Sequence, residues 1–278
     1  MKITSVVENT SRRGLPIEHG LSLYIEKDDG RKILFDMGQS ALFARNAEAM
    51  GLNIAYVDVA IISHGHYDHG GGLGTFLAGN SKAQVFIHRD AFQPHYSLRD
   101  DGLHYIGLDS ELKESDRLVY CDNLETIESG MTLFANVSGD CCNPAGNRRL
   151  FGPSESGNDS FHHEQNLVIE EGNNVVLFAG CAHRGIINII RKAEEVTGRT
   201  PTHVLAGMHL VKSGLNAISE NAFISTLASE LRKYSGTMFY TMHCTGSEQF
   251  TKLKSLLGKQ IDYLACGDTV QLVDFATQ

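Results

Sequence analysis

Apolar residues along the chain recur at two spacings, which together predict strands that alternate with helices. Short apolar or alternating runs predict strands over residues 3–7, 21–26, 32–36, 57–62, 83–87, 125–127, 131–134, 167–170, 175–179, 202–209, 237–243, 261–265 and 270–273. Apolar residues three and four positions apart predict helices over 41–50, 73–77, 186–196, 219–234 and 247–257. This mixture is typical of a layered protein in which helices pack on sheets.

The strongest chemical signal lies where the predicted strand 57–62 ends. Three histidines and one aspartate follow within six residues: His64, His66, Asp68 and His69. His64 and His66 are two positions apart, so in an extended chain their side chains point to the same side. Imidazole and carboxylate groups together suit zinc, iron or manganese, so this segment predicts a metal site.

Three further predicted strands also end close to a histidine. His183 follows strand 175–179, His209 ends strand 202–209, and His243 ends strand 237–243. In layered folds the strand ends form the edge at which ligands bind, so we expect these side chains to converge. His183 and His243 are predicted metal ligands, whereas His209 is either a ligand or a residue that contacts the substrate or supports a ligand.

Composition and charge narrow the class of protein. The net charge of −9 and the lack of basic runs argue against nucleic acid as the main partner. No apolar stretch reaches the roughly 20 residues that would cross a bilayer, and the first residues do not resemble a signal peptide. The six scattered cysteines are then expected to be reduced thiols, which predicts a cytoplasmic protein. The sequence does not indicate an oligomeric state.

Several motifs carry a family resemblance. His64-Gly65-His66-Tyr67-Asp68-His69 resembles the H-x-H-x-D-H signature of the metallo-β-lactamase superfamily. Other matching stretches are residues 18–22, 34–39, 163–165, 180–188, 207–210 and 243–246. Together they resemble a group of metal-dependent hydrolase-like proteins that includes 7,8-dihydropterin-6-methyl-4-(β-D-ribofuranosyl)aminobenzene 5′-phosphate synthase.

The resemblance implies a fold and a domain organisation. The fold class would be α+β, a four-layer αβ/βα sandwich of two mixed sheets, with metal ions at the edge of the sheets. Residues 1–278 would form a single domain. Residues 91–165 are the least regular part of the chain, and long irregular stretches within compact domains are usually functional. We therefore expect an insertion here that covers the active site.

The resemblance also implies a set of site residues. Two divalent ions, with zinc favoured and iron or manganese as alternatives, would be held by His64, His66 and His183 on one side and by Asp68, His69 and His243 on the other. Catalytic roles would fall to Asp68, as a proton acceptor, and to His209. Substrate contacts would come from Glu18, His19, Arg184 and again His209.

One position departs from the family pattern. Most hydrolases of the superfamily carry a metal-bridging aspartate where this chain has Cys181. Cys181 is either a thiolate ligand or a small buried residue, and the occupancy of the second metal site depends on which it is. His162 and His163 are candidates for the histidine that usually precedes this strand, in which case His183 would be an additional ligand.

These features lead to a ranked set of functional hypotheses. The first is a metal-dependent hydrolase-like or transferase-like enzyme whose substrate is a phosphorylated or diphosphorylated, pterin-like small molecule. The second is a phosphodiesterase or lactone hydrolase. A di-iron redox protein is disfavoured because His66 stands where such proteins carry a glutamate. A non-catalytic binding module is disfavoured because it has no need of an open metal site.

Overall fold

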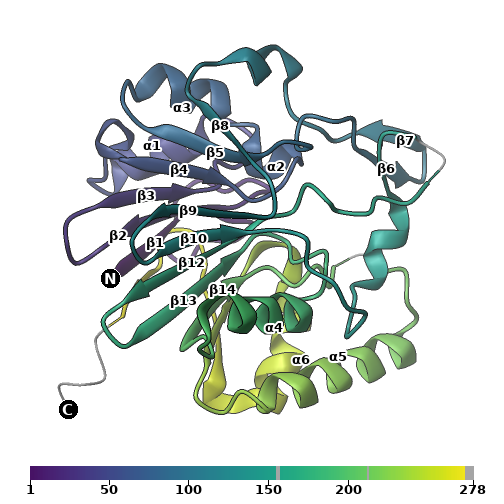
Figure 1. The fold of residues 1–278 in the computed structure, drawn as a ribbon. Coiled ribbons are helices and arrows are strands. Elements are labelled where there is room, and N and C mark those ends of the chain that lie inside the picture. The colour runs from purple at the N-terminus through teal and green to yellow at the C-terminus, as the bar shows by residue number, and fades with distance from the viewer. Residues whose placement is uncertain (155–156, 212, 273–278) are drawn as a thin grey trace. The chain divides into compact units, whose positions relative to one another are not determined.

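The computed structural model describes residues 1–154, 157–211 and 213–272. Contacts divide the chain into two compact units, each with its own mixed sheet and helices (Figure 1). Unit 1 contains Met1–Asp122 and the segment that starts at Leu264, whereas unit 2 is the continuous stretch Asn123–Tyr263. Residues 155–156 of the expected insertion and Val273 of the last predicted strand lie outside the described residues.

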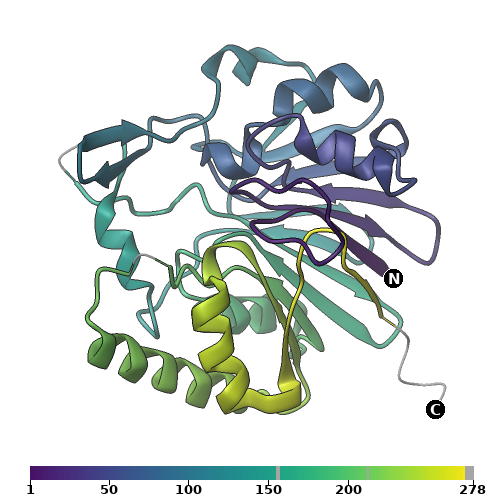
Figure 2. The ribbon, with the colours of Figure 1, turned by 180° about the vertical axis from the view of Figure 1, so that it is seen from behind.

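Unit 1 contains a seven-stranded sheet in the order β17-β1-β2-β3-β4-β5-β8. The strands are β1 (Lys2–Val7), β2 (Ser22–Glu26), β3 (Lys32–Phe35), β4 (Val59–Ile62), β5 (Gln84–His88), β8 (Leu118–Cys121) and β17 (Thr269–Gln271). From β3 to β8 neighbouring strands run parallel, whereas β1, β2 and β17 pair in antiparallel fashion. Figure 2 shows the C-terminal strand β17 beside β1.

Helices cover one face of the unit 1 sheet. They are α1 (Leu42–Ala49), α2 (Tyr67–Gly70) and α3 (Leu73–Gly79), with 3-10 turns η1 (Ile54–Tyr56) and η2 (Ser110–Glu114). Phe43 of α1 and Phe76 of α3 are fully buried in one cluster with Leu34, Ile62 and Ile87 of the sheet. Each such side chain contributes about 1.5–3 kcal/mol by leaving water. A hairpin of β6 (Tyr96–Arg99) and β7 (Gly102–Tyr105) completes the unit.

Unit 2 contains a second seven-stranded sheet, in the order β16-β15-β14-β13-β12-β10-β9. Its strands are β9 (Leu124–Glu128), β10 (Met131–Phe134), β12 (Asn166–Glu171), β13 (Asn174–Ala179), β14 (His203–Ala206), β15 (Met238–Thr241) and β16 (Ile261–Tyr263). Strands β13 to β16 run parallel, and the other neighbours are antiparallel. The unit also contains the short strand β11 (Leu150–Phe151).

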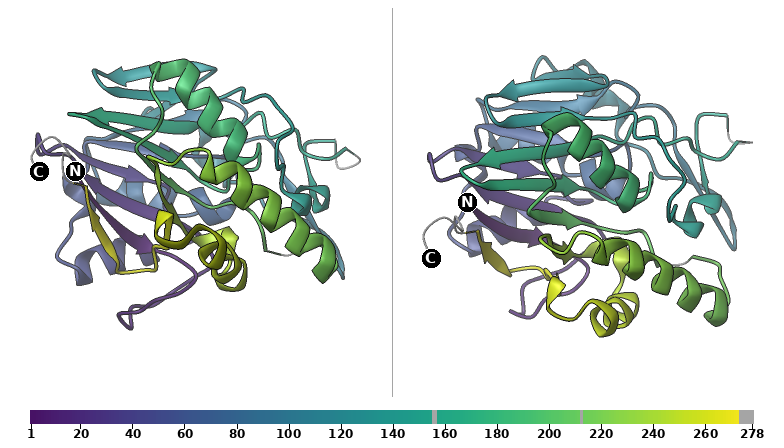
Figure 3. Two further views of the ribbon diagram at one scale, coloured as in Figure 1. Left: turned by 90° about the horizontal axis from the view of Figure 1, so that it is seen from below. Right: turned by 60° about the horizontal axis from the view of Figure 1, so that its bottom comes forward.

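The helices of unit 2 lie over its sheet (Figure 3), and they share one apolar cluster with it. They are α4 (Ile186–Thr197), α5 (Ala217–Arg232) and α6 (Ser247–Leu257), with 3-10 turns η3 (Ala145–Arg149), η4 (His243–Thr245) and η5 (Gly258–Gln260). Each helix contributes buried side chains to this cluster, for example Ile190 of α4, Leu227 of α5 and Leu253 of α6. None of the described helices in either unit is long and apolar enough to cross a membrane.

The predicted class, α+β with two mixed sheets, is confirmed, and most predicted elements lie within one or two residues of their observed ends. Two differences have physical causes. The sequence does not predict α2, because this single turn lies inside the polar histidine motif. The region 91–165 is also more regular than its sequence indicates, because the strands of the β6–β7 hairpin are only partly buried or exposed and lack an apolar pattern.

Candidate metal centre

In unit 1 the candidate residues lie where two parallel strands end. Asp36 follows β3, and Ser63 and His64 follow β4, so these side chains start from the same edge of the sheet. The turn α2 then brings Asp68 and His69 back toward that edge. His64 and His69 are fully buried, which is uncommon for polar side chains unless they have defined partners.

The donor atoms of unit 1 are spaced as the ligands of an ion would be. Nε2 of His64 lies 3.0 Å from Nδ1 of His66, and Oδ2 of Asp68 lies 3.9 Å from Nε2 of His69. Two ligands of a tetrahedral zinc ion, each about 2.0–2.2 Å from the metal, are roughly 3.3–3.6 Å apart. The observed spacings lie within about half an ångström of that range, so both pairs fit a divalent ion.

Asp36 supports this cluster, although the sequence analysis assigns it no role. Its carboxylate accepts hydrogen bonds from the Ser63 backbone N–H at 2.7 Å and from the Ser63 hydroxyl at 2.8 Å. It also lies 2.7 Å from Nδ1 of His69. Because an ionised carboxylate only accepts, Nδ1 of His69 carries the proton and Nε2 carries the lone pair that a metal requires. The sequence feature that could have indicated this role is the position of Asp36 directly after an apolar strand.

Close backbone approaches hold the motif in place. A Cβ at Gly65 would overlap the carbonyl oxygen of Ala91, and one at Gly72 would overlap that of Met37. The backbone of Tyr67 donates to the carbonyl of Ile106, which follows the β6–β7 hairpin. The glycines therefore allow the histidine segment to pack directly against neighbouring backbone.

Two further polar groups flank the motif in unit 1. Nε2 of His19 lies 3.1 Å from Oδ2 of Asp68, and the His19 side chain is half exposed. On the hairpin, the exposed Arg99 is hydrogen-bonded to the side chain of Tyr67. Burial and the neighbouring Asp68 raise the pKa of Tyr67, and Arg99 opposes that shift. The motif thus has a titratable imidazole and a guanidinium beside it.

Unit 2 repeats the same arrangement at the ends of its own parallel strands. Cys181 and His183 follow β13, His209 follows β14, and His243 and Cys244 follow β15. The donor atoms of Cys181, His183 and His209 all lie within 4.8 Å of one another. Those of Cys181, His243 and Cys244 do so as well, which places Cys181 in both donor groups.

The orientation of His183 is fixed by three neighbours. Its Nδ1 lies 3.0 Å from the amide oxygen of Asn147, so Nδ1 carries the proton and Nε2 the lone pair. Its ring stacks on Phe161 at a centroid distance of 4.4 Å. The buried carboxylate of Glu164 accepts from the backbone N–H groups of His183 and Arg184. Burial raises the pKa of Glu164 to about 7, although these hydrogen bonds oppose the shift.

The thiol of Cys244 has an unusual environment. Burial by itself raises the pKa of the thiol, but hydrogen bonds with Cys181 and His209 and the nearby His243 lower it well below the ordinary value. The backbone N–H of His209 donates to the Cys244 sulfur at 3.2 Å. Among the described residues, Nδ1 of His209 is a buried nitrogen without a hydrogen-bond partner. Sequence reasoning missed Cys244, whose only signal was its position next to His243.

Four non-glycine residues at these strand ends adopt the left-handed backbone conformation. The φ angles are 62° for Asp36, 53° for Ala182, 46° for His209 and 51° for His243. This region is unfavourable for most residues and persists only where the surrounding structure enforces it. The strand ends in both units therefore hold strained backbone at the positions that carry the candidate chemistry.

The substitution Gly207→Ala is expected to destabilise the protein by about 1–3 kcal/mol, since its Cβ would lie 2.5 Å from the Cys244 sulfur and 2.8 Å from the Gly180 carbonyl oxygen. Gly74→Ala in α3 is the matched control. Its Cβ meets Leu112 at an ordinary 3.7 Å, and alanine favours a helix, so this variant should be unchanged or more stable. Urea denaturation of both variants measures the difference, and equal stabilities would contradict the packing argument.

The other predicted residues have structural contacts. Glu18 accepts hydrogen bonds from the backbone N–H groups of Gln39 and Ser40, and Arg184 donates to the carbonyls of Val137 and Ser160. His163 lies 3.2 Å from the carboxylate of Asp159. Their roles in binding substrate or metal stay predictions, as does that of His162, which is exposed.

Comparison with known proteins agrees with this architecture. A family model described as the metallo-beta-lactamase superfamily matches residues 16–138. The solved structure of Tm1679, described as a metal-dependent hydrolase of the beta-lactamase superfamily, superposes with a TM-score of 0.81 at 27% identity, covering 99% of this chain and 100% of that one. The chain belongs to the metallo-beta-lactamase superfamily and has its fold, as the sequence predicts.

Two relatives in Methanocaldococcus jannaschii extend the similarity over most of the chain. The uncharacterized protein MJ0448 is 30% identical over 91% of this chain and 94% of its own length. The second relative is named 7,8-dihydropterin-6-methyl-4-(beta-D-ribofuranosyl)-aminobenzene-5'-phosphate synthase. It is 26% identical over 88% of both chains. Members of this superfamily bind metal ions, and the donor sets in both units are chemically suited to them.

Proposed function

We propose that this protein is a metal-dependent enzyme that acts on a phosphorylated or diphosphorylated small molecule, with a pterin-like compound as the leading candidate. The observation that carries the proposal is the buried donor pair of His64 and His66, whose facing nitrogens are 3.0 Å apart. The similarity to the dihydropterin-related phosphate synthase supports the substrate class.

The proposed metal ligands are His64, His66, Asp68 and His69 in unit 1, and His183 and His243 in unit 2. Two divalent ions are proposed, with zinc favoured because imidazole and carboxylate donors suit it. When bound, such ions polarise a phosphoryl or carbonyl oxygen and lower the pKa of a bound water.

The chain's own residues would move protons and hold the substrate. Asp68 is proposed as the proton acceptor, and the half-exposed His19, 3.1 Å from its carboxylate, would connect it to solvent. His209 is proposed to contact the substrate through the buried Nδ1 that has no partner among the described residues. Arg99, exposed and hydrogen-bonded to Tyr67, supplies a planar cation of the kind that binds phosphate groups in bidentate fashion.

The proposal is tested by elemental analysis of protein purified with and without air, alongside His183→Ala. We expect about two ions per chain in the natural protein. We expect fewer ions in the variant, because it loses an imidazole that Asn147 holds in the ligating tautomer. His203→Gln is the control, since His203 is buried within β14, away from its carboxyl end. The proposal would be contradicted if the natural protein bound no metal, or if His183→Ala bound as much metal as the natural protein.

The second candidate, a phosphodiesterase or lactone hydrolase, is favoured by the similarity to a structure described as a metal-dependent hydrolase. The two candidates differ in their co-substrate: a hydrolase uses water, whereas a transferase-like enzyme needs a second organic substrate. A hydrolase would turn over bis(p-nitrophenyl) phosphate or a simple lactone, whereas a transferase-like enzyme would leave both nearly untouched. Steady-state assays on the metal-loaded protein distinguish them.

A further inference from the structure

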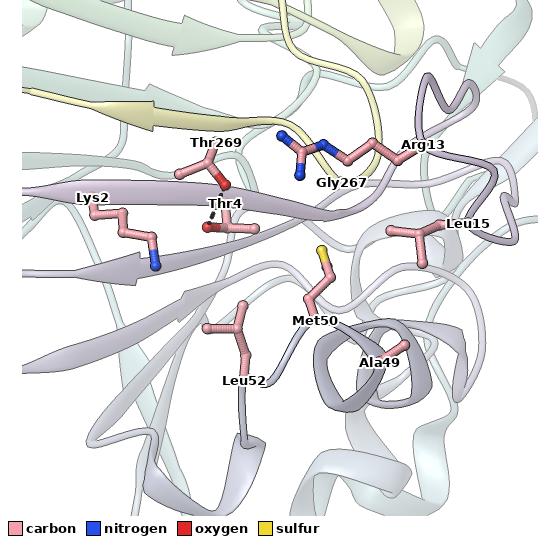
Figure 4. A pocket seen from close by; sticks show the side chains of 9 residues that line it. All are labelled: Lys2, Thr4, Arg13, Leu15, Ala49, Met50, Leu52, Gly267 and Thr269. Atoms are coloured by element: carbon pink, nitrogen blue, oxygen red, sulfur yellow. Dashed lines mark hydrogen bonds between the residues drawn. The ribbon is translucent and has the colours of Figure 1, made fainter.

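A separate pocket lies within unit 1, where three segments that are distant in sequence meet. Its volume is about 300 Å³, at the lower end of the range of roughly 300–1,000 Å³ that is usual for small-molecule sites. Figure 4 shows the residues that line it, namely Lys2, Thr4, Arg13, Leu15, Ala49, Met50, Leu52, Gly267 and Thr269. None of them belongs to the candidate metal centre.

The lining of this pocket is partly apolar and partly hydrogen-bonding. Leu15, Met50 and Leu52 present hydrocarbon and thioether surface. The hydroxyls of Thr4 and Thr269 lie 3.1 Å apart and join β1 to β17. One hydroxyl donates in this contact, so the other keeps a free O–H donor and both keep acceptor capacity for a bound polar group.

The charge of the pocket is positive, in a chain whose net charge is −9. Lys2 and Arg13 are its ionisable lining residues, and no carboxylate is among the described residues that line it. The Lys2 ammonium pairs with Glu26 at 2.8 Å, so part of its charge is already neutralised. Within the described part of the chain, the Arg13 guanidinium has no ion-pair partner, whereas its neighbour Arg12 pairs with Asp268 at 3.1 Å.

Gly267 allows Arg13 to lie over the pocket. Its φ of +89° disfavours other residues, and a Cβ there would lie 2.9 Å from Leu15 and 3.2 Å from the Arg13 side chain. Any larger residue would displace these two side chains. The glycine thus lets the stem of Arg13 pack on backbone, while the guanidinium points toward Thr269 (Figure 4).

We propose that this pocket binds a small organic anion with an apolar body. A carboxylate, sulfonate or phosphate group would contact Arg13 and the threonine hydroxyls, and the apolar part would lie against Leu15, Met50 and Leu52. A guanidinium makes strong, directional hydrogen bonds to such groups, and apolar contact supplies the remaining affinity. The proposal goes beyond the proposed function and does not depend on it.

The test uses the metal-loaded, full-length chain and the fluorescent probe 8-anilinonaphthalene-1-sulfonate, which combines an aromatic body with a sulfonate. We expect one saturable site whose Kd rises about tenfold or more in Arg13→Ala, because the charged contact is lost. Arg12→Ala is the matched control, since Arg12 pairs with Asp268 and does not line the pocket, so its Kd should stay within about twofold.

A second variant and a competition test separate this site from others. Met50→Glu places a like charge in the apolar wall and should weaken the probe at least as much as Arg13→Ala. Hexanesulfonate should displace the probe, whereas sulfate at the same concentration should not. No binding by the natural protein, equal binding by the Arg12 and Arg13 variants, or equal displacement by sulfate would each overturn the proposal.

Discussion

Replacing His64 with alanine is expected to remove bound metal and to reduce turnover by far more than 100-fold. The imidazole is fully buried, its Nε2 faces His66 at 3.0 Å, and its Nδ1 is held by the Ser63 hydroxyl at 2.9 Å. Loss of an outer contact to a metal ligand typically costs about 10–100-fold in affinity or activity, so loss of a ligand itself must cost more. Elemental analysis and steady-state assays measure both effects.

The matched control is His104→Ala, also in unit 1 but on the β6–β7 hairpin, where His104 is partly exposed and pairs with Asp101 at 2.8 Å. It should retain both metal and turnover. Thermal unfolding of the two variants separates loss of a ligand from loss of the fold. If the His64 variant folds and keeps its full metal content, His64 is not a ligand.

The substitution Asp36→Asn is expected to lower metal affinity by about 10–100-fold while the protein remains folded. Asparagine has the same shape and tolerates the left-handed φ of 62°, so the backbone need not move. The neutral amide, however, lacks the negative charge with which the Asp36 carboxylate accepts the hydrogen bond from Nδ1 of His69. Asp36→Ala should be worse, because each buried donor left without an acceptor costs about 1–3 kcal/mol.

These two effects are measured by metal titration with a competing chelator and by urea denaturation. Asp29→Asn serves as control, because Asp29 is a largely exposed acid in the same unit whose carboxylate pairs with Lys27 and accepts from the backbone N–H of Arg31. Equal metal affinity in the two asparagine variants would show that Asp36 acts only on the fold and not on the ligand.

The sequence predicts those parts of the protein whose signal is local. Alternating spacing locates β2, in which Leu23 and Ile25 are fully buried, and helical spacing locates α4 and α6, which bury apolar side chains in unit 2. The six residues from His64 to His69 identify metal chemistry because ligands are concentrated there within one turn. The superfamily and its fold follow from that motif, and comparison confirms both.

Other features depend on contacts between distant segments and leave no local pattern. The link from Asp36 to His69 spans 33 positions, and that from Asn147 to His183 spans 36. Nothing near Glu164 in the sequence indicates that its carboxylate binds the backbone of His183. The pocket around Arg13 likewise requires that residues 267–269 return to the N-terminal strand.

The pairing of β17 with β1 affects how the chain folds during translation. Ile3 pairs with Val270, so the edge of β1 stays open until the whole of unit 2 has been synthesised. At about 5–20 residues per second, translation of that stretch takes roughly seven to thirty seconds. Unit 2 is continuous and can fold on the ribosome during this time, while the exposed edge of β1 is open to pairing with other chains. Nascent protein is therefore vulnerable to pairing at this edge until β17 emerges.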